Sequence, residues 1–396
     1  MKFSALKCFL PAPLNIVLSV ASAILLVLAF PGFEFWFLAW FALVPLFFAV
    51  EREKESVVKS LFVGWIFGTA FFFGSCWWLT FAPITYAGFP FLLAYFLLFL
   101  ACLAVGFFSA IFAAVFSITL KRFGVYGIFA APFLWTATEF LRYWTTGNNW
   151  NAIGYSQAFH PYVKAFASIG GIYLVSFLVL LNASVIAFQL TYVISRKKQS
   201  VLSWISVSVI LFLLLLLPIF SASISNDGNY SSGQANVVAV QPNVPMSGLN
   251  YQKYQQLRRQ HVELAENALQ KVRQDTNSEQ QTIVIFPESP MNFMYSEDTE
   301  FQEFIKNFAA KNNVFVLFNA AEPDARNKAY FNSAVMIDAA GAKLAQYDKI
   351  YLVPFGESVP APLKNIGRLT MRFINSNTCP ILPNSRRRWL RGNLSI

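Results

Sequence analysis

Charged residues are scarce in this chain of 396 residues. Asp, Glu, Lys and Arg make up 13% of it, whereas about 25% is usual for a soluble domain. Apolar residues make up 56%, and 43 of them are phenylalanines. A soluble protein of this length would not bury so much apolar surface in its core. The composition therefore indicates a protein that lies in a lipid bilayer.

Metal-binding and disulfide-forming residues are also few. The chain has two histidines and four cysteines, without a Cys-x-x-Cys pair or a Cys/His cluster. This excludes the common zinc-binding and disulfide-stapled classes, and we expect no metal and no cofactor. The net charge of +10 does not indicate a nucleic-acid partner, because the basic residues mostly flank apolar runs or lie in the C-terminal tail.

The distribution of charge divides the chain into two parts. Residues 1–224 contain 12 Lys or Arg and 5 Asp or Glu, whereas residues 225–396 contain 18 and 15. We therefore predict a membrane domain over residues 1–224 and a water-soluble domain over residues 225–396.

Seven apolar runs in the first part have the length of a membrane crossing, which takes about 20 apolar residues. The expected spans are Leu14–Phe30, Glu34–Val50, Val58–Thr80, Phe91–Thr119, Val125–Tyr143, Ala165–Val193 and Leu202–Ser221. Ten basic residues then lie on one side of the membrane, namely Lys2, Lys7, Arg52, Lys54, Lys59, Lys121, Arg122, Arg196, Lys197 and Lys198, against Arg142 and Lys164 on the other. The positive-inside rule makes the first side cytoplasmic, and seven crossings place the soluble domain outside, in the periplasm of a cell with two membranes.

Two ionisable residues lie near the end of the fifth expected span. Glu139 and Arg142 are three residues apart, a spacing that allows them to pair on one helical face. Ionisable residues in a span are candidates for function, and a structural ion pair is an equally open alternative. The loop that follows, residues 144–163, is aromatic and polar without any acid, Lys or Arg. It is either a loop in the headgroup layer beside the soluble domain or an ordinary aromatic belt.

The second part alternates short apolar runs with polar, helical segments, which predicts an α/β domain. The expected strands are Ala235–Gln241, Thr282–Phe286, Val314–Asn319, Ala329–Asp338 and Lys343–Tyr347, and the expected helices are Tyr251–Arg273 and Thr299–Lys311. Gly341 is expected in the turn of a hairpin after Asp338.

Two charged residues of this part stand out chemically. Glu288 follows a buried apolar strand, and Lys349 precedes another apolar run. A carboxylate and an ammonium that share one cleft can act as general base and as stabiliser of an oxyanion. Each residue alone is more often a surface or paired charge.

Several motifs carry a resemblance to a known family. They are FPES (286–289), YFNSAVMID (330–338) and YDKIYLVPFGESVP (347–360), with QPN at 241–243 and NWNAIGYSQ at 149–157. Together with the upstream spans, they resemble the apolipoprotein N-acyltransferases, whose soluble domain is similar to nitrilases. The resemblance implies a multi-span α-helical membrane domain in the bacterial cell inner membrane and a periplasmic α/β domain with a nitrilase-like αββα sandwich.

The resemblance also implies a reaction and its residues. An acyl chain moves from a phospholipid donor, through a thioester, to the N-terminal amine of a diacylglyceryl apolipoprotein. Glu288 corresponds to the general base, Lys349 to the stabiliser of the oxyanion, and Glu357 to a second active-site carboxylate. Tyr251 and Trp150 fall near the substrate-binding positions.

The chain departs from the family pattern after about Met371. The family's catalytic cysteine lies several dozen residues after the lysine, behind an apolar strand. Cys379 follows a polar run instead, and Pro380 after it has no backbone N–H to donate. The arginine-rich tail fits neither a strand nor a span. We therefore expect a catalytic domain that is truncated at the C-terminus and has little or no transferase activity.

Other functions remain open from the sequence. A membrane-anchored amidase of the same soluble fold would use the same residues. A non-catalytic lipid- or lipoprotein-binding remnant would account for the missing cysteine motif. A transporter or channel is a third alternative, but its spans should carry polar residues at the midplane. Glu139 and Arg142 lie near one end of their expected span instead.

Overall fold

The computed structural model describes residues 10–85, 88–194, 235–244, 251–275, 280–288, 294–324, 329–350 and 352. The seventh expected span, Leu202–Ser221, lies outside the described residues, as do Glu357 and Cys379. The chain divides into two compact units, Met1–Tyr230 and Ser231–Ile396.

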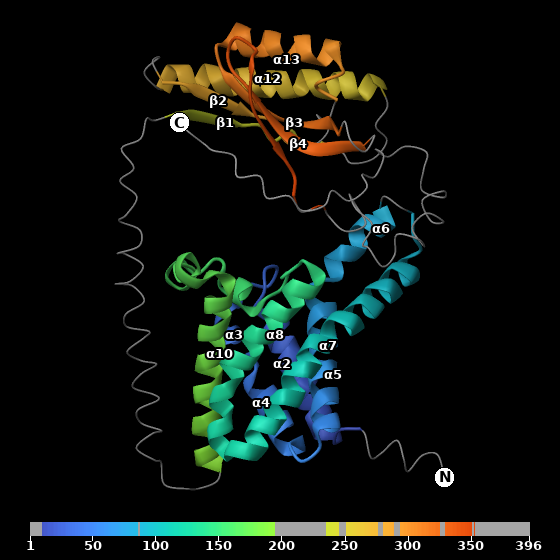
Figure 1. Cartoon of the computed structure of the whole chain (residues 1–396), viewed down its shortest axis with the longest axis vertical. Coiled ribbons are helices and arrows are strands. Elements are labelled where there is room, and N and C mark those ends of the chain that lie inside the picture. Colours follow the sequence, from blue (N-terminus) through green and yellow to red (C-terminus); the bar gives the residue numbers. More distant parts are fainter. Residues whose placement is uncertain are drawn as a thin grey trace. The chain divides into compact units, whose positions relative to one another are not determined.

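The first unit is a bundle of helices, drawn from blue to green in Figure 1. They are α2 (Pro13–Leu28), η1 (Trp36–Leu38), α3 (Ala39–Ala42), α4 (Val44–Glu53), α5 (Val57–Ser75), η2 (Trp77–Thr80), α6 (Phe81–Thr85), α7 (Phe91–Phe123), η3 (Gly124–Ala130), α8 (Ala131–Thr146), η4 (Ile153–Gln157), α9 (Pro161–Lys164) and α10 (Ala167–Ile194). Among the described residues, three helical stretches are long and apolar enough to span a membrane: Val57–Ser75, Phe91–Thr146 and Ala167–Thr191. The helix α2 is apolar but shorter.

Several expected spans are not single straight helices, which corrects the prediction from the sequence. The run Glu34–Val50 is divided among η1, α3 and α4, and Pro45 lies in the first turn of α4, where its missing N–H breaks no helical hydrogen bond. The run Val125–Tyr143 begins as the 3-10 helix η3, because Gly124 (φ +59°) ends α7. The helix α10 contains a kink at Gly171 (φ +62°). Hydropathy alone does not report such interruptions, since glycine and proline leave a run apolar.

The helices α5 and α7 are in close contact through small residues. A Cβ atom added at Gly68 would lie 2.7 Å from Ser109 Oγ and 2.8 Å from the carbonyl oxygen of Gly106. A Cβ atom added at Gly64 would collide with the Ser109 carbonyl and with Ala113. Small residues let two helix backbones approach within a bilayer, where lipid provides no hydrophobic drive for packing.

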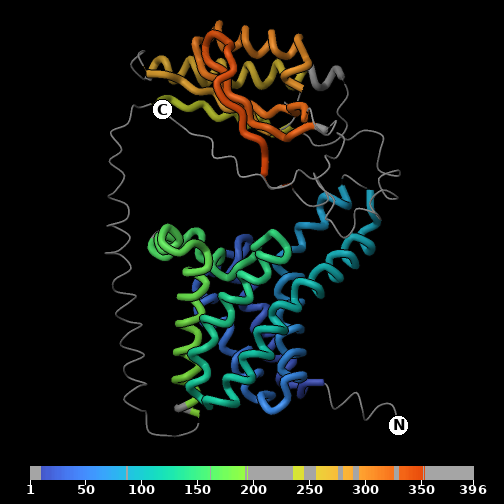
Figure 2. Tube along the Cα trace, viewed as in Figure 1, coloured from blue at the N-terminus to red at the C-terminus, as the bar shows by residue number. Residues whose placement is uncertain are grey.

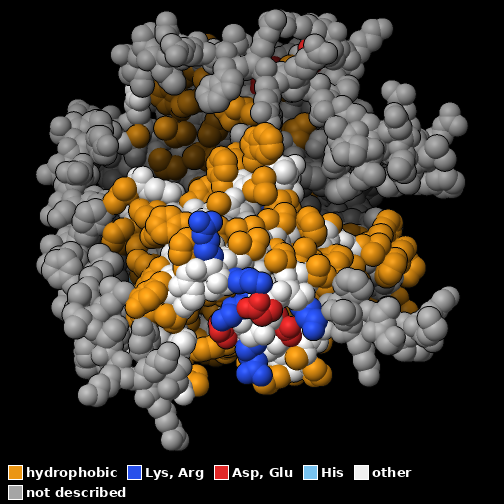
Figure 3. Space-filling view, turned by 60° about the horizontal axis from the view of Figure 1, so that its bottom comes forward, with side chains coloured by type: hydrophobic (Ala, Val, Ile, Leu, Met, Phe, Trp, Pro, Cys, Tyr) orange, Lys and Arg blue, Asp and Glu red, His pale blue; other side chains and the backbone are white. Residues whose placement is uncertain are grey.

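Charged side chains gather at one end of the first unit, surrounded by apolar surface (Figure 3). This end is formed where α4 ends, α5 begins and α7 ends, and its charged residues are Glu51, Arg52, Glu53, Lys54, Glu55, Lys59, Lys121 and Arg122. Four of them form two ion pairs, Lys54 with Glu51 and Lys121 with Glu55, both at 2.9 Å. Such a distribution is typical of the end of a helical bundle that leaves the membrane.

The second unit contains a five-stranded mixed sheet and two long helices, as expected of an α/β domain. The strands are β1 (Asn236–Ala239), β2 (Thr282–Ile285), β3 (Phe315–Asp324), β4 (Ala329–Ile337) and β5 (Lys343–Asp348), and the helices are α12 (Tyr251–Asp275) and α13 (Thr299–Asn312). The strand order is β1-β2-β3-β4-β5. The first three strands are parallel, and β3, β4 and β5 are antiparallel. The turn between β4 and β5 contains Gly341 at φ +81°, as predicted.

A row of buried side chains fixes the register of this sheet. Val238, Val284, Val316 and Ile337 are paired across four adjacent strands, and none is more than 5% exposed. Because a slip by one residue would turn each of them to the opposite face, the register is strongly determined. The helices lie on the same side of the sheet (Figure 2), where Phe301 of α13 joins this core. The second sheet of an αββα sandwich is not among the described residues.

Candidate active site

The structure brings Glu288 and Lys349 together, although 61 positions separate them in the sequence. Glu288 lies just beyond the carboxyl end of β2, and Lys349 directly follows β5. The Lys349 Nζ atom is 3.2 Å from Glu288 Oε1. The side chains of Lys349 and Glu288 are 31% and 60% exposed, so both groups are accessible to solvent.

Asn332 on β4 joins the two residues. Its Nδ2 atom donates a hydrogen bond of 2.8 Å to Glu288 Oε1, and its backbone carbonyl accepts one of 2.8 Å from the Lys349 backbone N–H. The Asn319 amide on β3 in turn donates to Asn332 Oδ1 (2.5 Å) and to the Ser333 carbonyl (3.1 Å). The carboxylate of Glu288 is thus oriented by a chain of amides that crosses two strands.

Neither Asn332 nor Asn319 was predicted from the sequence to be a site residue. Asn332 is part of the YFNSAVMID motif, and Asn319 ends the expected strand Val314–Asn319. The available signal was the position of an amide side chain within an otherwise apolar, alternating strand. Amides there need partners, and both side chains find them on the face of the sheet opposite the buried row.

A second group of hydrogen bonds fixes the end of β5 just before the lysine. The Ser333 hydroxyl donates to Asp348 Oδ1 (2.7 Å), and the Gln346 amide donates to the same oxygen (2.8 Å). Since Asp348 immediately precedes Lys349, these hydrogen bonds hold the chain in place next to the lysine.

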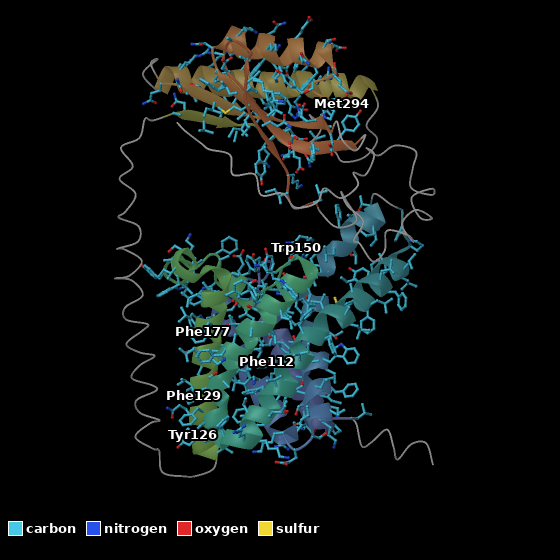
Figure 4. The ribbon with its side chains drawn as sticks, in the orientation of Figure 1. Phe112, Tyr126, Phe129, Trp150, Phe177 and Met294 are labelled. Carbon is cyan, nitrogen blue, oxygen red and sulfur yellow. The ribbon has the colours of Figure 1, made fainter. Side chains whose placement is uncertain are left out.

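The remaining residues predicted from the sequence lie outside the described residues or in the first unit. Glu357 and Cys379 lie outside the described residues. Tyr251 is the first residue of α12, and its side chain also lies outside the description. Trp150, which Figure 4 labels, lies in the first unit, in the loop after α8. It is 44% exposed, and its ring centre is 5.6 Å from that of Trp78.

Two family models match the chain in consecutive regions. The model described as "Apolipoprotein N-acyltransferase N-terminal domain" matches residues 22–185, and the model described as "Carbon-nitrogen hydrolase" matches residues 232–384. The first region lies in the helical unit and the second in the unit with the sheet. The chain belongs to the apolipoprotein N-acyltransferase family.

Curated apolipoprotein N-acyltransferases are similar to most of this chain. The protein of Geobacter metallireducens is 28% identical over 348 residues, which are 87% of this chain and 64% of that protein. The protein of Pasteurella multocida is 26% identical over 377 residues, 91% of this chain and 68% of that protein. This member of the family therefore spans about two thirds of the length of these relatives.

The family assignment confirms the resemblance that the motifs indicated. It also establishes that this N-acyltransferase family member is a membrane protein with a helical domain and a carbon-nitrogen hydrolase domain. Glu288, Asn332 and Lys349 all lie within the region that matches the carbon-nitrogen hydrolases, and Trp150 lies within the match to the N-terminal domain.

Proposed function

We propose that this chain carries the acid–base part of a lipoprotein N-acyltransferase site. The reaction transfers an acyl chain from a phospholipid to the N-terminal amine of diacylglyceryl-cysteine in an apolipoprotein. The observation that carries the proposal is the contact of 3.2 Å between Lys349 and Glu288 in a member of this family. The contact places a proton acceptor and a fixed positive charge side by side, as acyl transfer requires.

In the proposed reaction, Glu288 removes the proton of a thiol. The thiolate attacks the ester carbonyl of the phospholipid, and the ammonium of Lys349 stabilises the tetrahedral oxyanion. The C–O bond breaks, the lysophospholipid leaves with the proton from Glu288, and a thioester remains. The amine of the diacylglyceryl-cysteine then attacks the thioester, Glu288 takes its proton, and the amide forms as the thiol is regenerated.

The other predicted site residues receive proposed roles as well. Glu357 is the second carboxylate, which holds Lys349 or the base in position. Tyr251 and Trp150 contact the lipid-bearing substrates. No role in this proposal calls for a metal or a cofactor.

Of the groups that this reaction needs, the nucleophilic thiol has the least support in the sequence. Cys379 is the only cysteine after residue 102, and Pro380 follows it. Proline lacks the backbone N–H that often donates to the oxyanion at a nucleophile turn. We therefore propose that this chain, by itself, has little or no transferase activity.

The proposed location is the bacterial inner membrane, with residues 1–224 as membrane domain and residues 225–396 as periplasmic catalytic domain. The charged end of the first unit, which includes Arg52 and Lys121, would face the cytoplasm. The excess of basic residues on that side supports this orientation. Both substrates keep their acyl chains in lipid, so an enzyme anchored in the same membrane meets them without extracting them.

An assay in phospholipid nanodiscs tests the proposal. The purified chain is mixed with a synthetic diacylglyceryl-cysteine peptide, and mass spectrometry measures N-acylated peptide while fluorescence anisotropy measures binding. We expect saturable binding of the peptide without transfer above the protein-free background. Transfer that is lost in Glu288→Gln would establish the reaction and overturn the proposed inactivity. Hydrolysis of small amides without transfer would favour the amidase, and absence of peptide binding would overturn the proposed function.

A further inference from the structure

Two buried charged residues of α8 hold the loop that follows this helix. Glu139 and Arg142 are only 4% and 5% exposed. Arg142 donates from Nη1 to the carbonyl oxygen of Trp150 (2.5 Å) and from Nη2 to that of Asn149 (3.4 Å). Its guanidinium also lies 5.1 Å from the centre of the Phe72 ring. The arginine therefore binds the loop through two successive carbonyl groups.

Glu139 binds the same loop a few residues later. Its Oε1 atom accepts hydrogen bonds of 2.8 Å from the backbone N–H of Ile153 and from the indole N–H of Trp135. Residues 149–153 are thus held at both ends by one helical turn. Buried charges are costly unless they are hydrogen-bonded, and here the loop backbone binds the Arg142 guanidinium and one oxygen of the Glu139 carboxylate. Among the described ion pairs, Glu139 and Arg142 do not pair with each other, although their spacing allows it.

Neighbouring helices hold the loop from other sides. Asn151 adopts φ +57°, and its Nδ2 atom is bonded to Ser75 Oγ (2.6 Å) and Cys76 Sγ (3.1 Å) at the end of α5. The backbone N–H of Gly154 donates to Ser176 Oγ of α10 (2.9 Å). The loop is therefore attached to α5, α8 and α10 at once.

The same loop leaves one aromatic pair open to its surroundings. Gln157 is fully buried, donates to the Trp36 carbonyl (3.0 Å) and accepts from Trp40 Nε1 (3.2 Å). The rings of Trp150 and Trp78, by contrast, are 44% and 45% exposed. Buried, hydrogen-bonded residues of this loop thus present an exposed tryptophan pair, of which Figure 4 labels Trp150.

We propose that Glu139 and Arg142 are positioning residues, which fix residues 149–153 so that the Trp150 ring, against Trp78, contacts the diacylglyceryl peptide. The contact with this substrate rests on the proposed function, whereas the positioning of the loop does not. Amphipathic indole rings bind at the boundary between headgroups and acyl chains, where such a peptide lies. A rigid ring loses little conformational freedom on binding.

The first test measures the tryptophan rings directly. The full chain is labelled with 5-fluorotryptophan in nanodiscs, and Trp150, Trp78 and Trp65 are assigned by substitution with Phe. Arg142→Gln should shift and broaden the fluorine resonances of Trp150 and Trp78. The resonance of Trp65, whose indole donates to the Leu103 carbonyl (2.8 Å) elsewhere in the unit, should stay in place. Arg122→Gln, at the charged end of the same unit, is the matched control and should change neither resonance of the pair.

The conservative variant separates positioning from simple stabilisation. Arg142→Lys keeps the charge, but a single ammonium does not reproduce the planar fork that binds two carbonyls. We expect it to restore much of the thermal midpoint that Arg142→Gln loses, while the Trp150 resonance remains displaced. An unchanged Trp150 resonance in Arg142→Gln, or equal displacement of all tryptophans, would overturn the proposal.

The second test measures peptide binding. Loss of an aromatic anchor at a binding site typically weakens binding about tenfold or more, so Trp150→Ala should raise the dissociation constant by about that factor. Arg142→Gln, which releases the loop that holds the same ring, should raise it by a similar factor. The double variant should be no worse than Trp150→Ala, because both changes remove one contact. Wild-type affinity in Arg142→Gln would overturn the substrate contact. If the wild-type chain binds no peptide, the proposed function fails, and the fluorine spectra alone then decide the positioning of the loop.

Discussion

The side-chain amide of Asn332 donates to Oε1 of Glu288 at 2.8 Å, and this same oxygen lies 3.2 Å from the ammonium of Lys349. The carboxylate therefore has one oxygen that is held by two donors from β4 and from the end of β5. This arrangement orients Glu288 from the sheet, although the residue itself lies beyond the end of its own strand.

Stability at this site should depend on the asparagine more than on the ion pair. The pair of Lys349 and Glu288 is partly exposed, so Lys349→Met should change the free energy of unfolding by less than about 1 kcal/mol. Asn332→Leu removes one hydrogen-bond partner of Glu288 and one of Asn319 together and should cost about 1–3 kcal/mol. Hydrogen exchange of the β3 and β4 amides measures both effects. A larger loss for Lys349→Met than for Asn332→Leu would contradict this ranking.

The contact between α5 and α7 should tolerate no added methyl group at Gly64. Its Cβ atom would meet backbone of Ser109, which cannot move aside without displacing α7. We expect Gly64→Ala to lower the free energy of unfolding by about 1–3 kcal/mol, measured as thermal midpoint in detergent. Gly74→Ala is the matched control, because the three atoms nearest to its Cβ atom all belong to the side chain of Val27, the first at 2.9 Å, and not to backbone. Equal midpoints for the two variants would show that the helices can separate.

The second unit should lose stability in acid because of His261. This residue of α12 is fully buried, with Nδ1 2.6 Å from the Leu257 carbonyl, and burial lowers its pKa. Below the ordinary histidine pKa of about 6.5, the unfolded chain binds a proton that the folded chain does not. Stability should therefore fall as the pH drops below about 6.5, and this residue should add no pH dependence above it.

The full chain is treated with urea at about pH 5 and about pH 7.5. Hydrogen exchange of the α12 amides then reports the stability of the second unit at each pH. His261→Leu should reduce the difference between the two pH values. His160→Gln changes the only other histidine, which lies in the first unit, and should leave the difference intact. An unchanged difference in His261→Leu would assign the acid sensitivity to other groups.

The packing of α12 on α13 should depend on Arg258. Its guanidinium is 3.4 Å from Glu300 and lies 5.5 Å and 5.9 Å from the ring centres of Phe301 and Phe304. Because the residue is only 9% exposed, Arg258→Ala should remove both packing and charge interactions, at about 1–3 kcal/mol.

Lys311→Ala is the control for Arg258, since it breaks another ion pair between the same helices. The Lys311 side chain is 71% exposed in its pair with Glu266, so its removal should cost less than about 1 kcal/mol. Denaturant midpoints of the two variants give the comparison. A loss for Lys311→Ala as large as that for Arg258→Ala would show that exposed charge, and not burial, holds these helices together.

The sequence by itself determined the class of the protein and most of its elements. Scarce charge and long apolar runs indicate a bilayer because local composition sets the cost of burial in lipid. The strands around Val284 and Val316 and the turn at Gly341 follow from local apolar alternation and from the backbone freedom of glycine. The FPES and YDKIYLVPFGESVP motifs also identified Glu288 and Lys349 as candidate site residues.

Only the tertiary structure decided which side chains meet. The contact of Glu288 with Lys349 depends on sheet pairing between segments 61 positions apart, and Asn332 joins them because antiparallel pairing brings β4 beside β5. The spacing of Glu139 and Arg142 suggested a pair within one helix, yet both bind the backbone of the following loop. Periodicity reports which face of an element is buried, but the partners on that face are set by how distant segments pack together.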